Sequence, residues 1–186
     1  MGTVLLLQKV KQKNRPFASE EDHEMETRVV TLESFKIVGY QFRANLKEIE
    51  EFQLGKKTLD RLMTNQQFIR DRVSDDVYLV QLYDMKPGFN ANVDPFTQVI
   101  GYKVSGTQEV PREMVVHQVP ENMYVTATHL GVEAEIYKTY DFLYGTCVPE
   151  NSYYPLGYDF EIWDEGYKPE QHENKIGVYV AINKKG

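Results

Sequence analysis

The residues best suited to chemistry lie on one predicted strand near the C-terminus, 158–164, with the sequence YDFEIWD. Because side chains alternate along a strand, Glu161 and Trp163 point to the same face. A carboxylate beside an indole ring can bind a desolvated organic cation, since the acid neutralises the charge and each ring adds a cation–π attraction of about 0.5–2 kcal/mol. On another predicted strand, 77–84, Gln81 and Tyr83 share one face in the same way, in a segment whose sequence is similar to that of 160–164.

A second interpretation of these residues stays open, because a strand Glu usually faces water or a cross-strand Lys, and a single Trp usually lies in the core. The thirteen Tyr and nine Phe residues are equally ambiguous. Tyr suits a half-exposed sheet, and it also lines pockets with a ring that carries a polar tip. The further candidate pocket liners are Tyr78, Tyr102, Tyr124 and Tyr140.

The elements that must position these residues follow from hydrophobic periodicity and turn residues. One strand with an irregularity near Glu33-Ser34 is expected first, and a strand pair or one bent strand interrupted at Pro120 begins the second half. Gly55 is a candidate break in the first helical stretch. The remaining expected elements are helical stretches at 45–72 and 133–144, and strands at 77–84, 96–104, 158–164 and 176–182.

The order strand–helix–strand–strand therefore occurs twice, which suggests an internal duplication. The sequence VQLYD at 80–84 lies eighty positions before FEIWD at 160–164. We expect an α+β fold in which two pseudo-twofold-related β-α-β-β modules form an antiparallel sheet with two main helices and a central ligand cleft. Residues 1–24 are interpreted as an N-terminal extension. Residues 25–186 are interpreted as one domain with repeat halves at about 25–106 and 114–183.

The charge balance argues against direct nucleic-acid binding, because such binding depends on clustered Lys and Arg. Lys and Arg total 21 against 28 Asp and Glu, for a net charge of −7. One basic cluster, Lys9 to Arg15, is followed at once by the acidic run 20–24. The partner expected from the acid and the rings is therefore a small-molecule ligand, with an organic cation favoured.

The single cysteine, Cys147, allows no intrachain disulfide and fits a reducing compartment. The apolar run Val4–Leu7 is too short for a signal peptide or a membrane span. We therefore expect a cytoplasmic protein without membrane contact. The four His residues lack metal-ligand spacing and no Gly-rich phosphate loop is present, so neither a metal nor a cofactor is expected.

Several motifs together identify a family resemblance. The sequence resembles the GyrI-like, AraC-type effector-binding domains, and especially their integron-associated subset, over about residues 25 to 183. The resemblance implies a pocket between the two modules, and in relatives that regulate multidrug responses the acid on the penultimate strand, the position of Glu161, meets cationic lipophilic drugs. The matching segments are FKIVGY at 35–40, VY at 77–78, YD at 83–84, VIGY at 99–102, VP at 119–120, YV at 124–125, HLG at 129–131, DFEIW at 159–163 and VYVAI at 178–182.

Many members of that family carry an N-terminal DNA-binding domain, whereas 24 residues precede the match here. The resemblance therefore implies a stand-alone effector-binding protein linked to transcriptional regulation or drug response, either as the partner of a separate regulator protein or as a drug buffer. A protein-interaction or inhibitor module is an alternative, which contact between Tyr83 and Trp163 in a filled cleft would favour.

A hydrolase is the alternative from another class, because some family members are thought to hydrolyse strained electrophiles with an acid in the same pocket. Glu161 could activate water together with Trp163 or a nearby Tyr. The sequence offers no second well-placed carboxylate, since Asp164 faces away from Glu161, and no nucleophile–His pair. No catalytic residue is therefore assigned.

Overall fold

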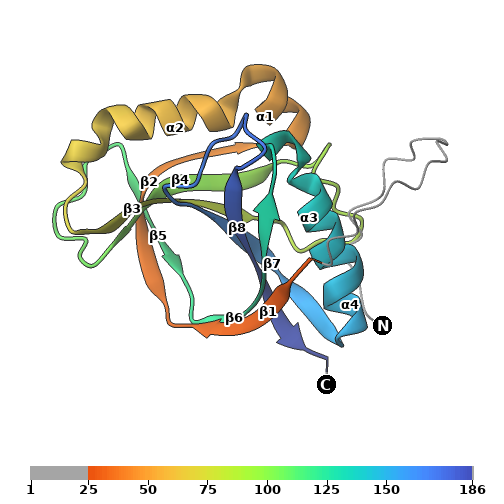
Figure 1. Cartoon of the computed structure of the whole chain (residues 1–186). Helices are drawn as coiled ribbons and strands as arrows, with labels where there is room; N and C mark the ends of the chain where they lie inside the picture. Colours follow the sequence, from red (N-terminus) through yellow and green to blue (C-terminus); the bar gives the residue numbers. More distant parts are fainter. Residues whose placement is uncertain (1–24, 186) are drawn as a thin grey trace.

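Alternating apolar residues on eight segments form a single antiparallel sheet, against which the helices pack (Figure 1). The structure, a computed structural model, describes residues 25–185, and the extension expected at 1–24 lies outside this range. The elements are β1 (Thr27–Leu32), β2 (Phe35–Ala44), α1 (Leu46–Phe52), α2 (Leu54–Asn65), β3 (Arg72–Leu82), β4 (Phe96–Val104), β5 (Val115–Val119), β6 (Asn122–Leu130), α3 (Tyr137–Phe142), α4 (Val148–Glu150), β7 (Tyr153–Trp163) and β8 (Lys175–Lys184).

The strand order has a twofold pattern. It runs β1-β6-β8-β7-β3-β4-β2-β5, and every neighbouring pair is antiparallel. Exchanging β1 with β5, β2 with β6, β3 with β7 and β4 with β8 gives the same order read backwards. The expected α+β class with one antiparallel sheet is thus confirmed, and β3 and β7 lie side by side at the centre of the sheet.

The centre of this pattern lies at one residue pair. Val80 on β3 is the cross-strand partner of Phe160 on β7, and both side chains are fully buried. These residues are eighty positions apart, which is the spacing between the two related sequence segments. Residues that match at this spacing, such as Gln81 and Glu161, therefore lie equally far from the centre of the sheet.

The segment expected as one irregular strand near Glu33 is two strands with different partners. β1 pairs with β6 of the second half, whereas β2 pairs with β4 and β5. In the same way β5 joins the first half while β6 stays in the second. β1 of the first half thus lies at the edge formed by the second half, and β5 of the second half lies at the edge formed by the first. Each half contains four strands, one more than the β-α-β-β unit that was expected.

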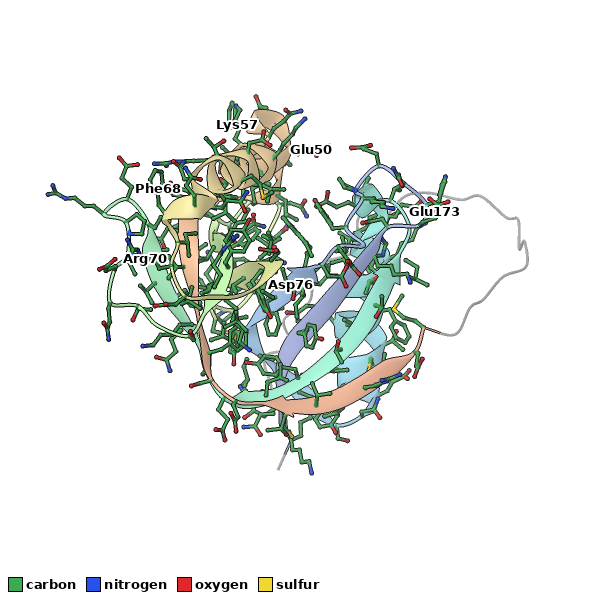
Figure 2. The ribbon with its side chains drawn as sticks, turned by 60° about the vertical axis from the view of Figure 1, so that its left-hand side comes forward. Glu50, Lys57, Phe68, Arg70, Asp76 and Glu173 are labelled. Atoms are coloured by element: carbon green, nitrogen blue, oxygen red, sulfur yellow. The ribbon has the colours of Figure 1, made fainter. Side chains whose placement is uncertain are left out.

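The first helical stretch begins at a capping box. The Asn45 side chain accepts a hydrogen bond from the Glu48 N–H, and the Glu48 carboxylate accepts one from the Asn45 N–H. The stretch breaks at Gln53, whose φ of 51° ends α1 in the left-handed conformation, two residues before the break expected at Gly55. Figure 2 shows Glu50 and Lys57 on the outer side of these helices, while Leu62 of α2 is fully buried against the sheet.

The second helical stretch extends further than its periodicity predicts. After α3 comes a π-helical turn at Leu143–Cys147, and α4 carries the stretch to Glu150. Leu143 and Val148 are buried beneath it, so this stretch covers the second half of the sheet (Figure 1). Within residues 25–185, no helix has both the length and the apolar character needed to cross a bilayer.

Candidate ligand-binding site

The helix-facing side of the two central strands carries an unusual set of polar side chains. The register places Gln81 opposite Asp159 and Leu79 opposite Glu161. Asp159 is fully buried, Glu161 is 4% exposed and Gln81 is 6% exposed. Two carboxyl groups thus lie at the centre of the sheet, beneath the second helical stretch.

Glu161 is held by two hydrogen bonds. Its Oε1 accepts a 2.8 Å bond from the Tyr140 hydroxyl, and its Oε2 accepts a 2.8 Å bond from the Trp163 indole N–H. Burial raises the pKa of Glu161 to about 8, although both of these donors favour the charged form and lower it. At neutral pH the buried carboxyl group therefore holds its proton most of the time.

Asp159 lies two residues before Glu161 on the same face of β7. Its Oδ2 accepts a 2.6 Å hydrogen bond from the Tyr144 hydroxyl, and its Oδ1 accepts a 2.9 Å bond from the Gln81 amide. The Gln81 amide oxygen in turn accepts a 2.8 Å bond from Gln98 on β4. Burial raises the pKa of Asp159 to about 6, and its hydrogen-bond donors keep it below that of Glu161.

The Tyr140 hydroxyl joins the two acids. It lies 2.8 Å from Glu161 and 3.5 Å from Asp159, and it is also 2.9 Å from the Gln81 amide nitrogen. When Glu161 is protonated, it can donate to the Tyr140 oxygen while Tyr140 donates to Asp159. One proton can therefore be shared along the line from Glu161 to Asp159.

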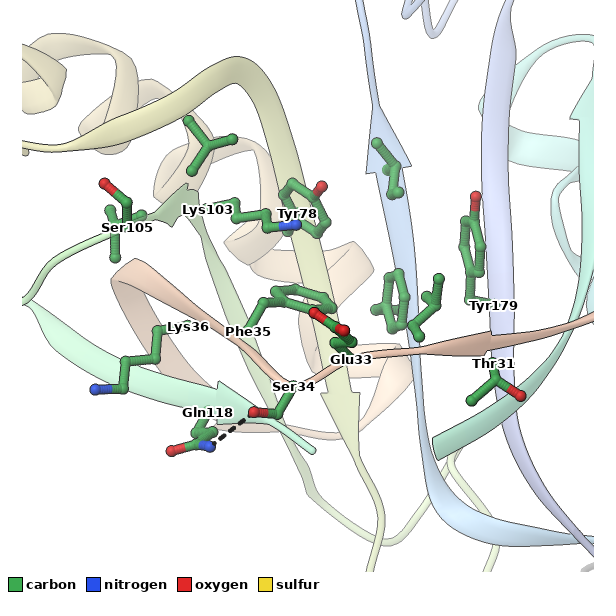
Figure 3. Close-up of a pocket in the computed structure, with 15 residues that line it drawn as sticks. Thr31, Glu33, Ser34, Phe35, Lys36, Tyr78, Lys103, Ser105, Gln118 and Tyr179 are labelled. Carbon is green, nitrogen blue, oxygen red and sulfur yellow. Dashed lines mark hydrogen bonds between the residues drawn. The ribbon is translucent and has the colours of Figure 1, made fainter. Parts of the chain in front are cut away.

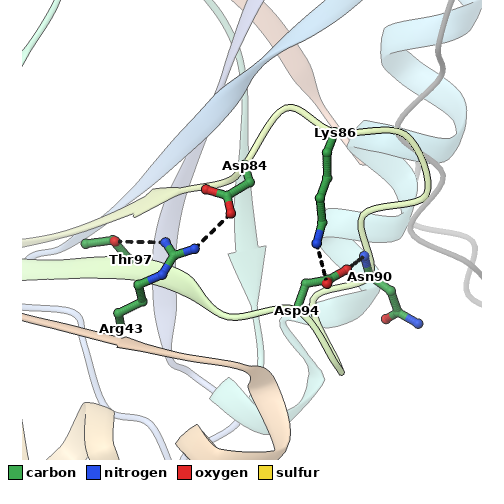
Figure 4. Close-up of polar contacts among 6 residues, drawn as sticks. All are labelled: Arg43, Asp84, Lys86, Asn90, Asp94 and Thr97. Carbon is green, nitrogen blue, oxygen red and sulfur yellow. Dashed lines mark hydrogen bonds and ion pairs between the residues drawn. The ribbon is translucent and has the colours of Figure 1, made fainter.

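Neither acid has a cationic partner within residues 25–185. Seven ion pairs form among the described residues, and none of them includes Asp159 or Glu161. Figure 4 shows two of these pairs, Arg43 with Asp84 and Lys86 with Asp94, which lie in and beside the loop after β3. A buried carboxylate without a counter-charge is costly, so the pair is suited to accept a cation from outside.

Aromatic rings surround the two acids. Trp163 stacks on Tyr167 with ring centroids 4.6 Å apart, and Tyr140 stacks on Tyr144 at 6.4 Å. Burial, and next the charge of Asp159, raise the pKa of Tyr83, Tyr140 and Tyr144 well above the ordinary value. These phenols therefore remain neutral, and their rings offer π faces to a cation.

The structure brings four predicted residues into contact and places a fifth next to them. Glu161, Trp163, Tyr140 and Gln81 belong to the hydrogen-bond network, which we call the acid cluster together with Asp159 and Tyr144. Tyr83 borders this cluster and packs on Phe89 and Phe96. No aromatic contact joins Tyr83 to Trp163, so the contact expected for a filled cleft does not form.

Three predicted pocket residues lie elsewhere. Tyr78 and Tyr124 belong to the core cluster on the opposite face of the sheet, because each is an odd number of residues from the helix-facing positions of its strand. Tyr102 faces the end of α2, where its hydroxyl group contacts Met63 and Gln66. None of the three hydroxyl groups bonds to the acid cluster.

Asp159 and Tyr144 were missed by sequence reasoning. The expectation that no second carboxylate accompanies Glu161 is wrong, because Asp159 reaches the same proton network. Strand alternation from Glu161 would have found Asp159, and helical spacing of four from Tyr140 would have found Tyr144.

The described residues contain no group of three or more His, Cys, Asp or Glu side chains arranged to hold a metal ion.

Comparison with known proteins gives this geometry a context. Residues 28–182 match the family Cass2, described as integron-associated effector binding protein, in agreement with the resemblance of the sequence motifs. The transcriptional regulator BrlR of Pseudomonas aeruginosa is 30% identical over 89 residues, which are 47% of this chain and 33% of BrlR. The chain thus matches about a third of that regulator's length.

Two solved structures share the fold at low sequence identity. SAV2435 bound to tetraphenylphosphonium has a TM-score of 0.64 and 11% identity, over 86% of this chain and 94% of SAV2435. The integron cassette protein VCH_CASS2 from the mobile metagenome of Vibrio cholerae has a TM-score of 0.55 and 13% identity, over 84% of this chain and 95% of that protein. These similarities concern the fold.

Proposed function

Because the chain belongs to the Cass2 family of integron-associated effector binding proteins, we propose that it binds a lipophilic aromatic cation at its acid cluster. The observation that carries this proposal is the pair of buried acids, Asp159 and Glu161, without a cationic partner in the described residues. A cation supplies the missing counter-charge, and the rings of Trp163 and Tyr140 contact its apolar surface. The complex of SAV2435 with tetraphenylphosphonium supports this ligand class.

Ligand entry requires the cover over the acids to move. Tyr140 and Tyr144 lie on the helical stretch above β7, and both are hydrogen-bonded to the acids that the ligand must reach. This stretch consists of short pieces: α3 has six residues and is followed by the π-helical turn. Irregular turns of this kind are frequent at functional sites, and we assign the opening motion to this segment.

The biological role proposed is effector sensing by a cytoplasmic protein that acts with a separate regulator. Its similarity to BrlR supports a link to transcription. The net charge of −7 argues that this chain does not itself hold nucleic acid. Cation binding would then be signalled through the segment that covers the acid cluster.

Trp163 provides the test, because it is the single tryptophan and its indole N–H bonds directly to Glu161. We expect tetraphenylphosphonium to quench its fluorescence saturably, and neutral triphenylphosphine oxide to quench it far less. Glu161→Gln should weaken cation binding about tenfold or more, since it removes a carboxylate at the site. Glu165→Gln is the matched control, because Glu165 is exposed and loses the same charge. Equal affinity in the two variants would reject the proposal.

Hydrolysis of a reactive electrophile is the second candidate function. It is favoured by the presence of a second buried acid, Asp159, beside Glu161. Two buried acids joined through Tyr140, with pKa values of about 6 and about 8, form a base and an acid of the kind used in proton transfer. Product formation from a strained electrophile, abolished by both Asp159→Asn and Glu161→Gln, would establish an enzyme. Saturable binding without product supports the sensor.

A further inference from the structure

A pocket lies on the face of the sheet opposite the helices. It has a volume of about 680 Å³, and we call it the rear pocket; its central lining residues are Phe35, Tyr78, Lys103, Phe160, Ile162 and Tyr179 (Figure 3). Phe160 separates Asp159 from Glu161 along β7, so its side chain points away from the acid cluster. The rear pocket is therefore separated from the acid cluster by the sheet, and its size is typical of small-molecule sites.

The floor of the rear pocket is aromatic. The rings of Phe160 and Tyr179 stack in parallel, with centroids 4.7 Å apart and an interplanar angle of 6°. Phe35 meets the Phe160 ring edge-on at 5.7 Å and lies 5.4 Å from the Tyr78 ring. Phe160 is fully buried between its neighbours, so the rings that a ligand can reach are those of half-buried Phe35 and Tyr179, and the space beside them fits a planar aromatic molecule.

The deepest charge in the rear pocket is positive. The Lys103 ammonium group lies 4.9 Å from the centroid of the Phe35 ring, and the residue is half-buried. It forms no ion pair with any residue of the described range. The other charged lining residues, Glu33 and Lys36, are exposed, so solvent and salt screen them more strongly than Lys103. Their opposite charges also offset each other.

The Tyr78 hydroxyl group adds a donor to the same pocket. Burial raises the pKa of Tyr78 to about 12, so this group keeps its proton at physiological pH. Lys103 and Tyr78 both lie against Phe35, the ammonium group 4.9 Å and the Tyr78 ring centroid 5.4 Å from the centroid of its ring (Figure 3). A neutral phenol and an ammonium group both donate hydrogen bonds, and together they suit an anionic oxygen.

We propose that the rear pocket binds a planar aromatic monoanion, a carboxylate or a sulfonate, with its ring against Phe35 and Tyr179 and its acid group at Lys103. This ligand class has the opposite charge to the cation proposed for the acid cluster. The two sites lie on opposite faces of β7, so they can be occupied independently.

The test uses the full chain and the fluorescent aromatic sulfonate 1-anilinonaphthalene-8-sulfonate, with N-phenyl-1-naphthylamine as its neutral analogue. We expect saturable binding of the sulfonate that weakens as NaCl is raised, and weaker binding of the neutral compound. Lys103→Met should weaken sulfonate binding about tenfold, whereas Lys103→Arg should retain it. Lys47→Met, at an exposed position on α1, is the control for loss of one positive charge.

The outcomes separate this proposal from the one for the acid cluster. Glu161→Gln should leave sulfonate binding unchanged, and excess tetraphenylphosphonium should not displace the sulfonate. Displacement by the cation, or loss of binding in Glu161→Gln, would place the sulfonate at the acid cluster and overturn the proposal. Equal weakening in Lys103→Met and Lys47→Met would overturn it as well. The thermal midpoint of each variant, measured in the same buffer, identifies any change caused by unfolding.

Discussion

Tyr140 reaches across from the helical stretch to Glu161, with its hydroxyl oxygen 2.8 Å from Oε1 of that carboxyl group. The contact joins the cover of the acid cluster to the acid beneath it. Because the same hydroxyl group lies 3.5 Å from Asp159, movement of Tyr140 alters the surroundings of both acids at once. Protonation of the acids and the position of α3 are therefore linked through one phenol, and the cation binding that we propose is linked to both.

Cation binding should release a proton and strengthen as pH rises. The cation favours the ionised form of Glu161, whose pKa of about 8 keeps it protonated at neutral pH. Affinity for tetraphenylphosphonium should therefore rise from pH 6.5 towards pH 9, with a net release of up to about one proton per ligand at pH 7. Calorimetric titrations in buffers with different ionisation enthalpies measure this release. In Glu161→Gln this upper pH step should disappear, and its persistence would assign the titration to another group.

Loss of the Tyr140 hydroxyl group should weaken cation binding most at neutral pH. Tyr140→Phe keeps the ring but removes a donor that stabilises ionised Glu161, so the pKa of this acid should rise further. The pH profile of tetraphenylphosphonium affinity should shift upward while its high-pH limit changes little. Tyr137→Phe, at an exposed position of α3, provides the control. A uniform loss of affinity at every pH would instead indicate that the hydroxyl group contacts the ligand.

Sequence reasoning located much of the acid cluster because two of its signals are local. Strand alternation and the spacing of eighty residues singled out Glu161, Trp163 and Gln81, and Tyr140 was one of the four further Tyr residues expected to line a pocket. Alternation also excludes Tyr78 from the helix-facing side, because it is one residue from Leu79. Tyr78 was nevertheless included among the pocket residues because of the high aromatic content of the chain. The assignment of Tyr78 to the Glu161 pocket therefore failed although the necessary information was in the sequence.

The exchange of edge strands could not be predicted in the same way. The pairing of β1 with β6 joins residues 90 to 100 positions apart, from Leu32 with Asn122 to Thr27 with Ala127. The residues of β1 suit a strand in either half, so their partner is decided by which edge remains open once the central strands have paired. The hydrogen bonds from Gln98 through Gln81 to Asp159 depend instead on the register of the central strands β4, β3 and β7.

Glu161 should lower the stability of the folded protein at high pH. Burial raises its pKa to about 8 from an ordinary value of 4.5, so the folded state binds more protons than the unfolded state between these values. The resulting stabilisation is fully present below about pH 4.5 and is lost as pH rises towards 8.

The variant Glu161→Gln tests this linkage. Gln reproduces the hydrogen bonds of the protonated acid, because its oxygen can accept from Trp163 while its amide donates to Tyr140. The gain in the urea-derived free energy of unfolding over the wild type should therefore grow between pH 5 and pH 8. A pH-independent difference, compared with the Glu165→Gln control, would show that Glu161 does not titrate abnormally.

A side chain added at the paired glycines of β2 and β4 should destabilise the folded protein. Gly39 pairs with Gly101, and a Cβ atom added at Gly39 would lie 2.0 Å from the backbone oxygen of Ile100. Backbone atoms cannot move aside as a flexible side chain can, so Gly39→Ala should cost on the order of 2–4 kcal/mol in the free energy of unfolding. Gly55→Ala is the matched control, because nothing lies within 4 Å of its added Cβ atom and α2 should gain roughly 0.5–1 kcal/mol. Urea unfolding of the two variants measures both values, and a Gly39→Ala protein as stable as the wild type would mean that these strands are further apart than described.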